Sequence, residues 1–233
     1  LTLRLYPTSY PSSSAGGWLA QGGAGIGSYE FGWFADNVLS ARAVLPSGEV
    51  REFHGKDLEL IADAEGTTGI VTQLTLRVQK SEDLDLAAIA CPDASKLTKA
   101  FQEFILQDLP LWSVVFINPR MAEMKNRAPL RMQHGHPAEH KVLLPVTYIV
   151  ILAFREADRS RAMAGLRVVL ENCQGEMLSQ EIAEHEWENR FKLMVVKRLG
   201  PSLVPAEVVV PLERLGDFMA EIEKKVNQPL VKE

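Results

Sequence analysis

The sequence predicts an α+β fold in two domains, residues 1–80 and residues 84–233. Two observations predict it. In the first eighty residues, apolar and polar residues alternate over short segments bounded by glycine and proline, which is typical of half-buried strands. After a polar break at residues 79–83, the pattern becomes strand, helix, strand, strand, helix, strand, an order found in compact α+β sandwiches.

The composition is that of an ordinary soluble globular protein, with 46% hydrophobic and 24% charged residues. The net charge of −5 and the lack of a long basic run argue against nucleic acid as a main partner. No apolar run reaches about 18 residues, so no transmembrane segment is predicted. Cys91 and Cys173 have no metal-ligand spacing, and we interpret them as reduced thiols of a cytoplasmic protein.

The N-terminal 14 residues begin with Leu1, Leu3 and Leu5 in the alternation of a strand. Pro7 and Pro11 then interrupt regular structure. An extended entry into the domain and a frayed terminus are both compatible with this segment.

The next stretch, residues 15–34, holds seven of the chain's 16 glycines. Glycine adopts positive φ without penalty and lets a backbone approach a ligand closely, but each one costs roughly 0.5–1 kcal/mol in a regular element. The spacing matches neither the dinucleotide motif G-x-G-x-x-G nor a P-loop. Two interpretations stay open: a structural loop rich in turns, or a loop that binds a flat or phosphorylated ligand.

Residues 35–53 are predicted to form a hairpin around the turn Pro46-Ser47-Gly48. Residues 56–64 are predicted to form a short helix. A glycine-bearing turn from Glu65 then leads into a strand that ends at Val78. Taken alone, Glu65 is an exposed turn carboxylate.

Three motifs occur in order: GGW…GGxGIGSxxxG, DNVL…VLPSGEV and EGTTGIVTQLTLRV. Together they resemble the FAD-linked oxidases of the vanillyl-alcohol oxidase superfamily, over roughly residues 10–80. The nearest resemblance is to the glycolate oxidase flavin subunit and D-lactate dehydrogenases. It implies that residues 1–80 are the C-terminal part of a PCMH-type FAD-binding domain, with backbone groups from two segments lining FAD. The implied residues are Ser14, Ala15, Gly16, Gly17, Ala20, Gly23, Gly25, Ile26, Gly27, Glu65, Gly66, Gly69, Ile70 and Val71.

The second domain is predicted to open with a strand at residues 84–91 and a helix that Asp93 caps. The helix has one apolar face. That face comprises Leu97, Ala100, Phe101, Phe104 and Ile105. Further strands are predicted at residues 112–117, 143–154 and 176–182.

A second helix, capped by Asp158 and ended by Gly175, is predicted before the last of these strands. A helical stretch follows at residues 183–199. Residues 206–210 are predicted to form a short strand, after which Pro211 opens the final helix.

These elements resemble the ferredoxin-like cap domain of the same oxidases, which covers the flavin and shapes the substrate pocket. Trp187 and Arg190 match the W-x-x-R element of that cap. The planar fork of arginine binds both oxygens of a carboxylate, so the resemblance implies a catalytic-site role for Arg190. The alternative is an ordinary solvated or salt-bridged arginine on an amphipathic helix.

His134, His136 and His140 form H-x-H-x-x-x-H, and imidazoles suit zinc or iron. The stretch is bounded by prolines and has the composition of a surface loop, with no cysteine nearby. We therefore predict no metal site. The carboxylates between Glu181 and Glu188 are interpreted as a solvated helix face.

The resemblance implies oxidation of a small 2-hydroxy acid of the glycolate or D-lactate type by hydride transfer to FAD. It also implies an iron–sulfur subunit or a quinone as electron acceptor, and the sequence is compatible with a homodimer. The family's pyrophosphate loop and its downstream return to the FAD domain do not appear, so we expect this chain alone to bind FAD weakly or not at all. The alternative is a truncated, non-catalytic paralogue that serves as a scaffold or regulatory subunit.

Overall fold

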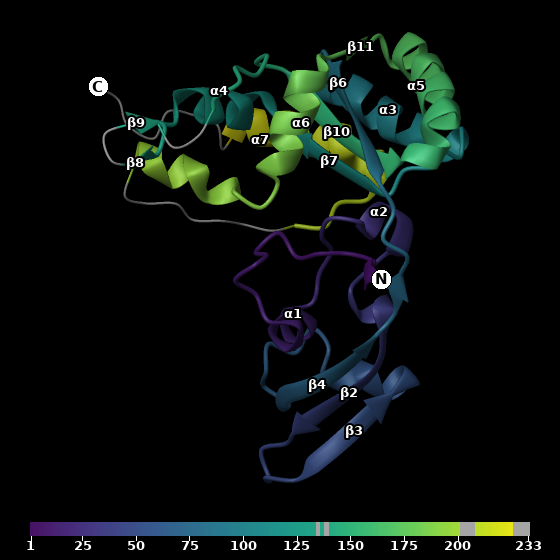
Figure 1. The fold of residues 1–233 in the computed structure, drawn as a ribbon, viewed down its shortest axis with the longest axis vertical. Coiled ribbons are helices and arrows are strands. Elements are labelled where there is room, and N and C mark those ends of the chain that lie inside the picture. Colours follow the sequence, from purple (N-terminus) through teal and green to yellow (C-terminus); the bar gives the residue numbers. More distant parts are fainter. Residues whose placement is uncertain (134–135, 138–139, 201–207, 226–233) are drawn as a thin grey trace. The chain divides into compact units, whose positions relative to one another are not determined.

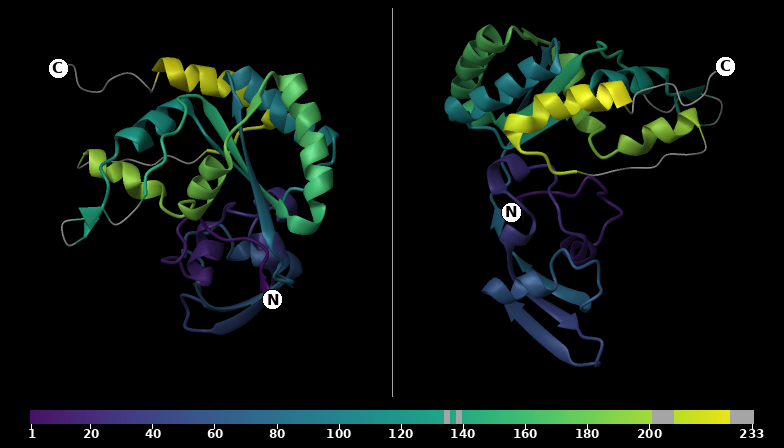
Figure 2. Two further views of the ribbon diagram at one scale, coloured as in Figure 1. Left: turned by 45° about the horizontal axis from the view of Figure 1, so that its top comes forward. Right: turned by 180° about the vertical axis from the view of Figure 1, so that it is seen from behind.

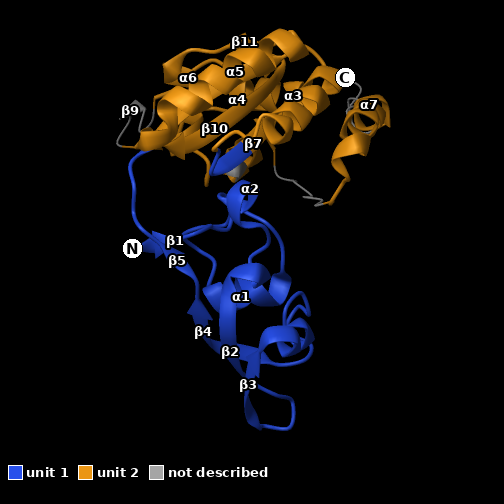
Figure 3. Ribbon diagram, turned by 90° about the vertical axis from the view of Figure 1, so that its right-hand side faces the viewer, with its two compact units in different colours: residues 1–84, 111–114 blue, residues 85–110, 115–233 orange. Residues whose placement is uncertain are grey.

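The computed structural model describes residues 1–133, 136–137, 140–200 and 208–225 (Figure 1). Figure 2 gives two further views of the elements. The chain divides into two compact units, coloured separately in Figure 3. Unit 1 comprises residues 1–84 and 111–114, and unit 2 comprises residues 85–110 and 115–233. The predicted break at residues 79–83 lies next to this division, whereas residues 111–114 carry no sequence signal that places them in unit 1.

Unit 1 is built on a three-stranded antiparallel sheet with the order β3-β2-β4, and a second antiparallel pair joins β1 to β5. Its strands are β1 (Thr2–Leu3), β2 (Val38–Val44), β3 (Val50–His54), β4 (Ile70–Leu76) and β5 (Val78–Gln79). Its helices are α1 (Ala15–Gln21), α2 (Ser28–Phe31) and the 3-10 helices η1 (Ala35–Asn37) and η2 (Gly55–Leu60). The hairpin of β2 and β3 and the strand β4 form as predicted. Where a helix was predicted at residues 56–64, the 3-10 helix η2 ends at Leu60 and residues 61–64 form turns.

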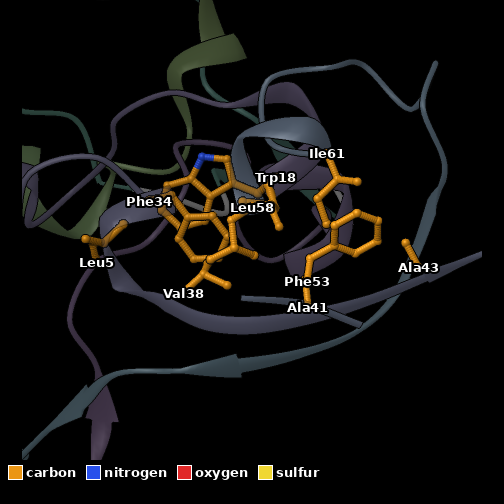
Figure 4. Packing of buried hydrophobic residues seen from close by; sticks show 10 residues of the cluster. Leu5, Trp18, Phe34, Val38, Ala41, Ala43, Phe53, Leu58 and Ile61 are labelled. Carbon is orange, nitrogen blue, oxygen red and sulfur yellow. The ribbon is translucent and has the colours of Figure 1, made fainter. Parts of the chain in front are cut away.

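The core of unit 1 lies between helix α1 and the sheet (Figure 4). Trp18 stacks on Phe34, with ring centroids 4.0 Å apart and planes 15° from parallel. Ala41 and Phe53, directly opposite each other on β2 and β3, are buried in the same cluster. Small residues on the sheet therefore leave room for the large aromatic rings, as close packing requires.

Residues 15–21 form a helix, which corrects the prediction of a glycine loop over the whole stretch. Ser14 caps the helix by accepting a hydrogen bond from the backbone N–H of Gly17, at 3.1 Å. Trp18 and Leu19 are buried, with 5% and 1% of their surface exposed. Because tertiary burial of such side chains contributes about 1.5–3 kcal/mol each, it offsets the helix penalty of Gly16 and Gly17.

Unit 2 is a four-stranded sheet with the strand order β11-β6-β10-β7 and helices on its faces (Figures 1 and 2). The strands of this sheet are β6 (Leu84–Cys91), β7 (Ser113–Ile117), β10 (Tyr148–Arg155) and β11 (Glu176–Met177). Two further strands, β8 (Met132–Gln133) and β9 (His136–Pro137), form a separate antiparallel pair. Its helices are α3 (Ala94–Leu106), α4 (Pro119–Arg127), α5 (Arg159–Cys173), α6 (Gln180–Glu188) and α7 (Leu215–Lys225). The 3-10 helices are η3 (Glu156–Asp158), η4 (Leu193–Leu199) and η5 (Leu212–Arg214).

Strand β10 is buried on both faces along almost its whole length. Ile149 and Ile151 pack with Ile182 and Ala183 of α6. Since successive side chains of a strand point to opposite faces, Val150 and Leu152 serve the other face, and both are fully buried. The continuous apolar run of β10 thus reflects a sheet covered on both sides.

Several predicted details of unit 2 are wrong. Ile105, assigned to the buried face of α3, has 63% of its surface exposed. The fourth strand ends at Met177, because Ser179 caps α6 at residues that were predicted as strand. Helix α5 ends with Gln174 in the left-handed conformation, one residue before the predicted Gly175. Of the strand predicted at residues 206–210, residues 206–207 lie outside the described residues, and 208–210 are not in a strand.

Cys91 and Cys173 are free thiols that meet in the core of unit 2, and neither has exposed surface. The hydrogen bond with Cys173, followed by burial, raises the pKa of the Cys91 thiol well above its ordinary value. Since the reactive species is an accessible thiolate, we expect neither cysteine of the folded protein to react with the thiol reagent DTNB. In guanidinium chloride both thiols should react, and fast labelling of one thiol in the folded protein would contradict this packing.

Within the described part of the chain, no helix combines the length and apolarity needed to cross a bilayer.

Candidate cofactor site

The first predicted segment centres on the N-terminal turn of α1. Ser14 accepts a hydrogen bond from the N–H of Gly17 through Oγ, and its carbonyl accepts one from the N–H of Trp18, at 3.0 Å. The first N–H groups of a helix have no partner within the helix itself. The N–H groups of Ala15 and Gly16 therefore point out of the helix as donors.

The second predicted segment, Glu65 to Val71, lies against the same helix. The N–H of Glu65 donates to the carbonyl oxygen of Ala20 at 2.7 Å, and the N–H of Asp63 donates to that of Leu19 at 3.0 Å. At the start of β4, the carbonyl oxygen of Val71 would lie 3.0 Å from a Cβ built on Gly16. The structure thus brings together two segments that are some forty residues apart in the sequence.

The turn at residues 63–66 carries backbone strain. Asp63, Glu65 and Gly66 all have positive φ, at 54°, 49° and 77°. Residues other than glycine adopt this region rarely, and such strain persists where surrounding contacts fix it. Here the two hydrogen bonds to the end of α1 fix the turn.

Two glycines of the predicted site face open space. Gly23 and Gly66 have φ of 107° and 77°, and a Cβ built on either would meet no atom within 4 Å. At both positions a flat ligand is able to reach the backbone, which is the property that makes glycine useful in binding loops. Open space beside Gly23 and Gly66 and the N–H donors of Ala15 and Gly16 are thus the features of this region that a bound ligand could use.

At three other predicted residues, the backbone N–H group already donates a hydrogen bond within the protein. The N–H of Gly25 donates to Oγ of Ser28, and that of Ile26 donates to the carbonyl oxygen of Tyr6, both at 2.8 Å. The N–H of Gly27 donates to Oγ of Ser113 at 3.2 Å. These three N–H groups have their partners in the protein, so the glycines at 25 and 27 serve close packing of chain on chain.

Sequence reasoning missed the residues that hold this loop. Asn37 is buried and donates through Nδ2 to the carbonyl oxygens of Phe31 and Trp33, at 2.8 and 3.0 Å. Trp112 donates through Nε1 to the carbonyl oxygen of Arg4 at 2.8 Å. The only sequence hint was Asn37 in the motif DNVL, and nothing marks residues 112–113.

Arg190 lies in unit 2, directly after α6. Its guanidinium carbon is 4.3 Å from the ring centroid of Trp187 and 4.5 Å from that of Phe191. Its Nη1 donates to the carbonyl oxygen of Trp187 at 2.5 Å. The two residues of the W-x-x-R element therefore contact each other, and the aromatic rings fix the guanidinium.

The histidine motif falls partly outside the described residues, which include neither His134 nor the side chain of His136. His140 lies 3.4 Å from Oε1 of Glu181, and both side chains are exposed. The described residues contain no cluster of three side chains suited to a metal ion.

Comparison with known proteins relates the N-terminal part of unit 1 to a protein family. Residues 1–54 match the family described as an FAD binding domain. Over this part of its length the chain is similar to FAD-linked oxidoreductases. These comparisons support FAD as the cofactor. Of the two predicted segments, Gly23 and Gly66 have open space beside the backbone, and Ala15 and Gly16 have N–H groups at the start of α1 that would be available to it.

Two curated relatives carry the name D-lactate dehydrogenase. The mitochondrial, cytochrome-type enzyme of Arabidopsis thaliana is 36% identical over 88 residues, which is 34% of this chain and 16% of that protein. The Archaeoglobus fulgidus protein is 24% identical over 163 residues, 66% of this chain and 35% of that protein. The chain thus spans about a third or less of the length of these relatives.

Solved structures show the same fold. An alkyldihydroxyacetonephosphate synthase matches 84% of this chain and 39% of its own with a TM-score of 0.64 at 18% identity. This likeness supports the α+β architecture of the chain and says nothing about its substrate.

Proposed function

We propose that this protein is an FAD-dependent oxidoreductase that oxidises a small 2-hydroxy acid. The observation that carries the proposal is the guanidinium of Arg190, which contacts the rings of both Trp187 and Phe191. A planar, oriented guanidinium is well suited to bind both oxygens of a carboxylate. The two relatives named D-lactate dehydrogenase support the substrate class.

When bound, FAD supplies the redox chemistry by accepting a hydride from the substrate. The residues of this chain contribute binding and orientation. Backbone N–H groups of Ala15 and Gly16 and the open backbone at Gly23 and Gly66 would hold the cofactor. Arg190 holds the substrate carboxylate, so that the carbon bearing the hydroxyl keeps one orientation.

Unit 2 takes the place of the cap domain in this proposal, because its strand order β11-β6-β10-β7 matches a ferredoxin-like sandwich. An iron–sulfur subunit or a quinone is the proposed electron acceptor, and the cytoplasm the proposed location. The hypothesis of a non-catalytic scaffold has no support from the match of residues 1–54 to an FAD binding domain.

Replacing Arg190 by methionine tests the proposed role. The loss of a charged hydrogen bond to the substrate costs about 2 kcal/mol, so we expect kcat/KM for D-lactate or glycolate to fall about 30-fold. Arg190→Lys should lower kcat/KM by a smaller factor, because lysine keeps the positive charge. Reduction of bound flavin under anaerobic conditions is the measurement.

The matched control is Arg127→Met. Arg127 is also an arginine at the end of a helix in unit 2, with 65% of its side chain exposed and Glu123 as its partner. Its replacement should leave kcat/KM within twofold. Equal rates for wild type and Arg190→Met would reject a substrate-binding role for Arg190.

A further inference from the structure

A cavity of about 60 Å³ lies inside unit 2, apart from the residues discussed so far. It is walled by α4, α6 and η4 and by the chain at residues 128–130 and 140–144. A single water needs roughly 10–15 Å³ of such space. The cavity therefore has room for a small organic molecule, while a nucleotide or a long acyl chain is too large. Arg190 is not among its lining residues.

The lining carries an excess of positive charge. Its cationic side chains are those of Lys125, Lys141, Lys192 and Arg198. Its one carboxylate is that of Glu186, so the net charge is four minus one, or +3, with the lining histidines neutral. Lys125 forms an ion pair with Glu186, so Lys141 and Lys192 are the lining lysines that remain for a bound anion.

Lys141 and Lys192 are oriented by neutral oxygen atoms. Nζ of Lys141 donates to the carbonyl oxygen of Ala128 at 2.8 Å, and Nζ of Lys192 donates to Oδ1 of Asn189 at 3.0 Å. Neither lysine forms an ion pair with a carboxylate of the described residues. A neutral acceptor positions an ammonium group without cancelling its charge, so both charges act on whatever enters the cavity.

The remaining wall is aliphatic. It is formed by Ala128, Pro129, Leu130, Val142, Leu144 and Val195. An inorganic anion would lose hydration against this wall without a compensating contact. A carboxylate with a short aliphatic chain suits both the charged and the apolar part of the lining. Its charge interacts with the lysines, and its chain covers the apolar surface.

We propose that this cavity is a binding site for a small aliphatic carboxylate, distinct from Arg190 and independent of the proposed flavin chemistry. Butyrate is the probe, added to the full chain without FAD and followed by backbone amide NMR. We expect saturable shifts at residues 128–130, 142–144 and 189–195. Butan-1-ol, the neutral analogue, should bind at least tenfold more weakly because it lacks the charge.

Two variants remove the charges one at a time. Lys141→Gln and Lys192→Gln should each weaken butyrate binding about tenfold, since each removes one charged hydrogen-bond donor. Lys197→Gln is the matched control, because Lys197 lies on η4, the 3-10 helix that begins directly after Lys192, and does not line the cavity. Val195→Phe fills the space without changing a charge and should abolish binding.

The proposal is overturned by any of four results: no saturable butyrate shift, equal affinity for butan-1-ol, tighter binding of inorganic phosphate than of butyrate, or an equal loss in Lys197→Gln. If a lysine variant does not fold, as judged by its NMR spectrum, the test rests on Val195→Phe. Unchanged butyrate affinity in Val195→Phe would also overturn the proposal.

Discussion

Replacing Gly25 by alanine should destabilise unit 1 by about 3 kcal/mol, at the upper end of the usual cost of overpacking. A Cβ at this position would lie 2.1 Å from the carbonyl oxygen of Tyr6 and 3.1 Å from Cζ2 of Trp18. The backbone of Tyr6 has little freedom to move away, because Tyr6 and Ile26 exchange two hydrogen bonds of 2.9 and 2.8 Å. The substitution must therefore break this bridge or displace the buried Trp18.

Amide hydrogen exchange at Tyr6 and Ile26 measures the effect where it arises, since both N–H groups belong to the bridge. Gly200→Ala is the control: Gly200 has an extended φ of 179°, and a Cβ there would meet no atom within 4 Å. We expect the control to match the wild type within about 0.5 kcal/mol. Unchanged exchange at Ile26 in Gly25→Ala would show that the two chain segments do not approach as closely as described.

Removing one partner of the buried ion pair between Lys125 and Glu186 should cost about 3–5 kcal/mol, because it leaves an uncompensated buried charge. The exposed fractions of the two side chains are 14% and 3%. Glu186 also contacts a second side chain: its Oε1 lies 3.0 Å from Nδ1 of His185. We therefore expect Lys125→Met to lower the free energy of unfolding of unit 2 strongly, as measured by urea denaturation.

The double variant Lys125→Met with Glu186→Leu removes both charges and should recover most of that loss, since a buried ion pair is often replaceable by apolar residues of similar size. The surface pair of Arg120 and Glu123 is the comparison, with 39% and 41% of the side chains exposed. Breaking it by Arg120→Met should cost less than about 1 kcal/mol. A similar cost for both pairs would mean that water reaches Glu186.

The sequence predicted the elements of this fold well where local chemistry decides them. Asp93 caps α3 by accepting a hydrogen bond from the N–H of Lys96 at 2.8 Å, and Gly48 takes φ of 85° in the predicted hairpin turn. The prediction from the sequence was wrong where tertiary packing determines the local structure. Burial of Trp18 makes a helix of a glycine-rich stretch, a competition that no local pattern reveals.

The candidate site was predicted as a set of residues but not as a set of roles. The resemblance implied two cofactor-binding segments, which the structure brings together at α1, yet it gave Gly23 and Gly25 the same role. The structure separates them, because Gly23 borders open space and Gly25 borders the backbone of Tyr6. Likewise, Ser113 accepts the hydrogen bond of Gly27 from 86 residues away, and a contact at such separation leaves no trace in one sequence.

The most direct test of the proposed cofactor site is an FAD titration of the protein at its native length, comparing wild type with Gly23→Val and Gly48→Val. The two glycines are matched: both have positive φ, at 107° and 85°, and both border open space, so valine strains the backbone similarly at each. We predict at least tenfold weaker FAD binding in Gly23→Val and unchanged binding in Gly48→Val, with similar thermal stability. Equal FAD affinity in the two variants would contradict a cofactor site that includes Gly23.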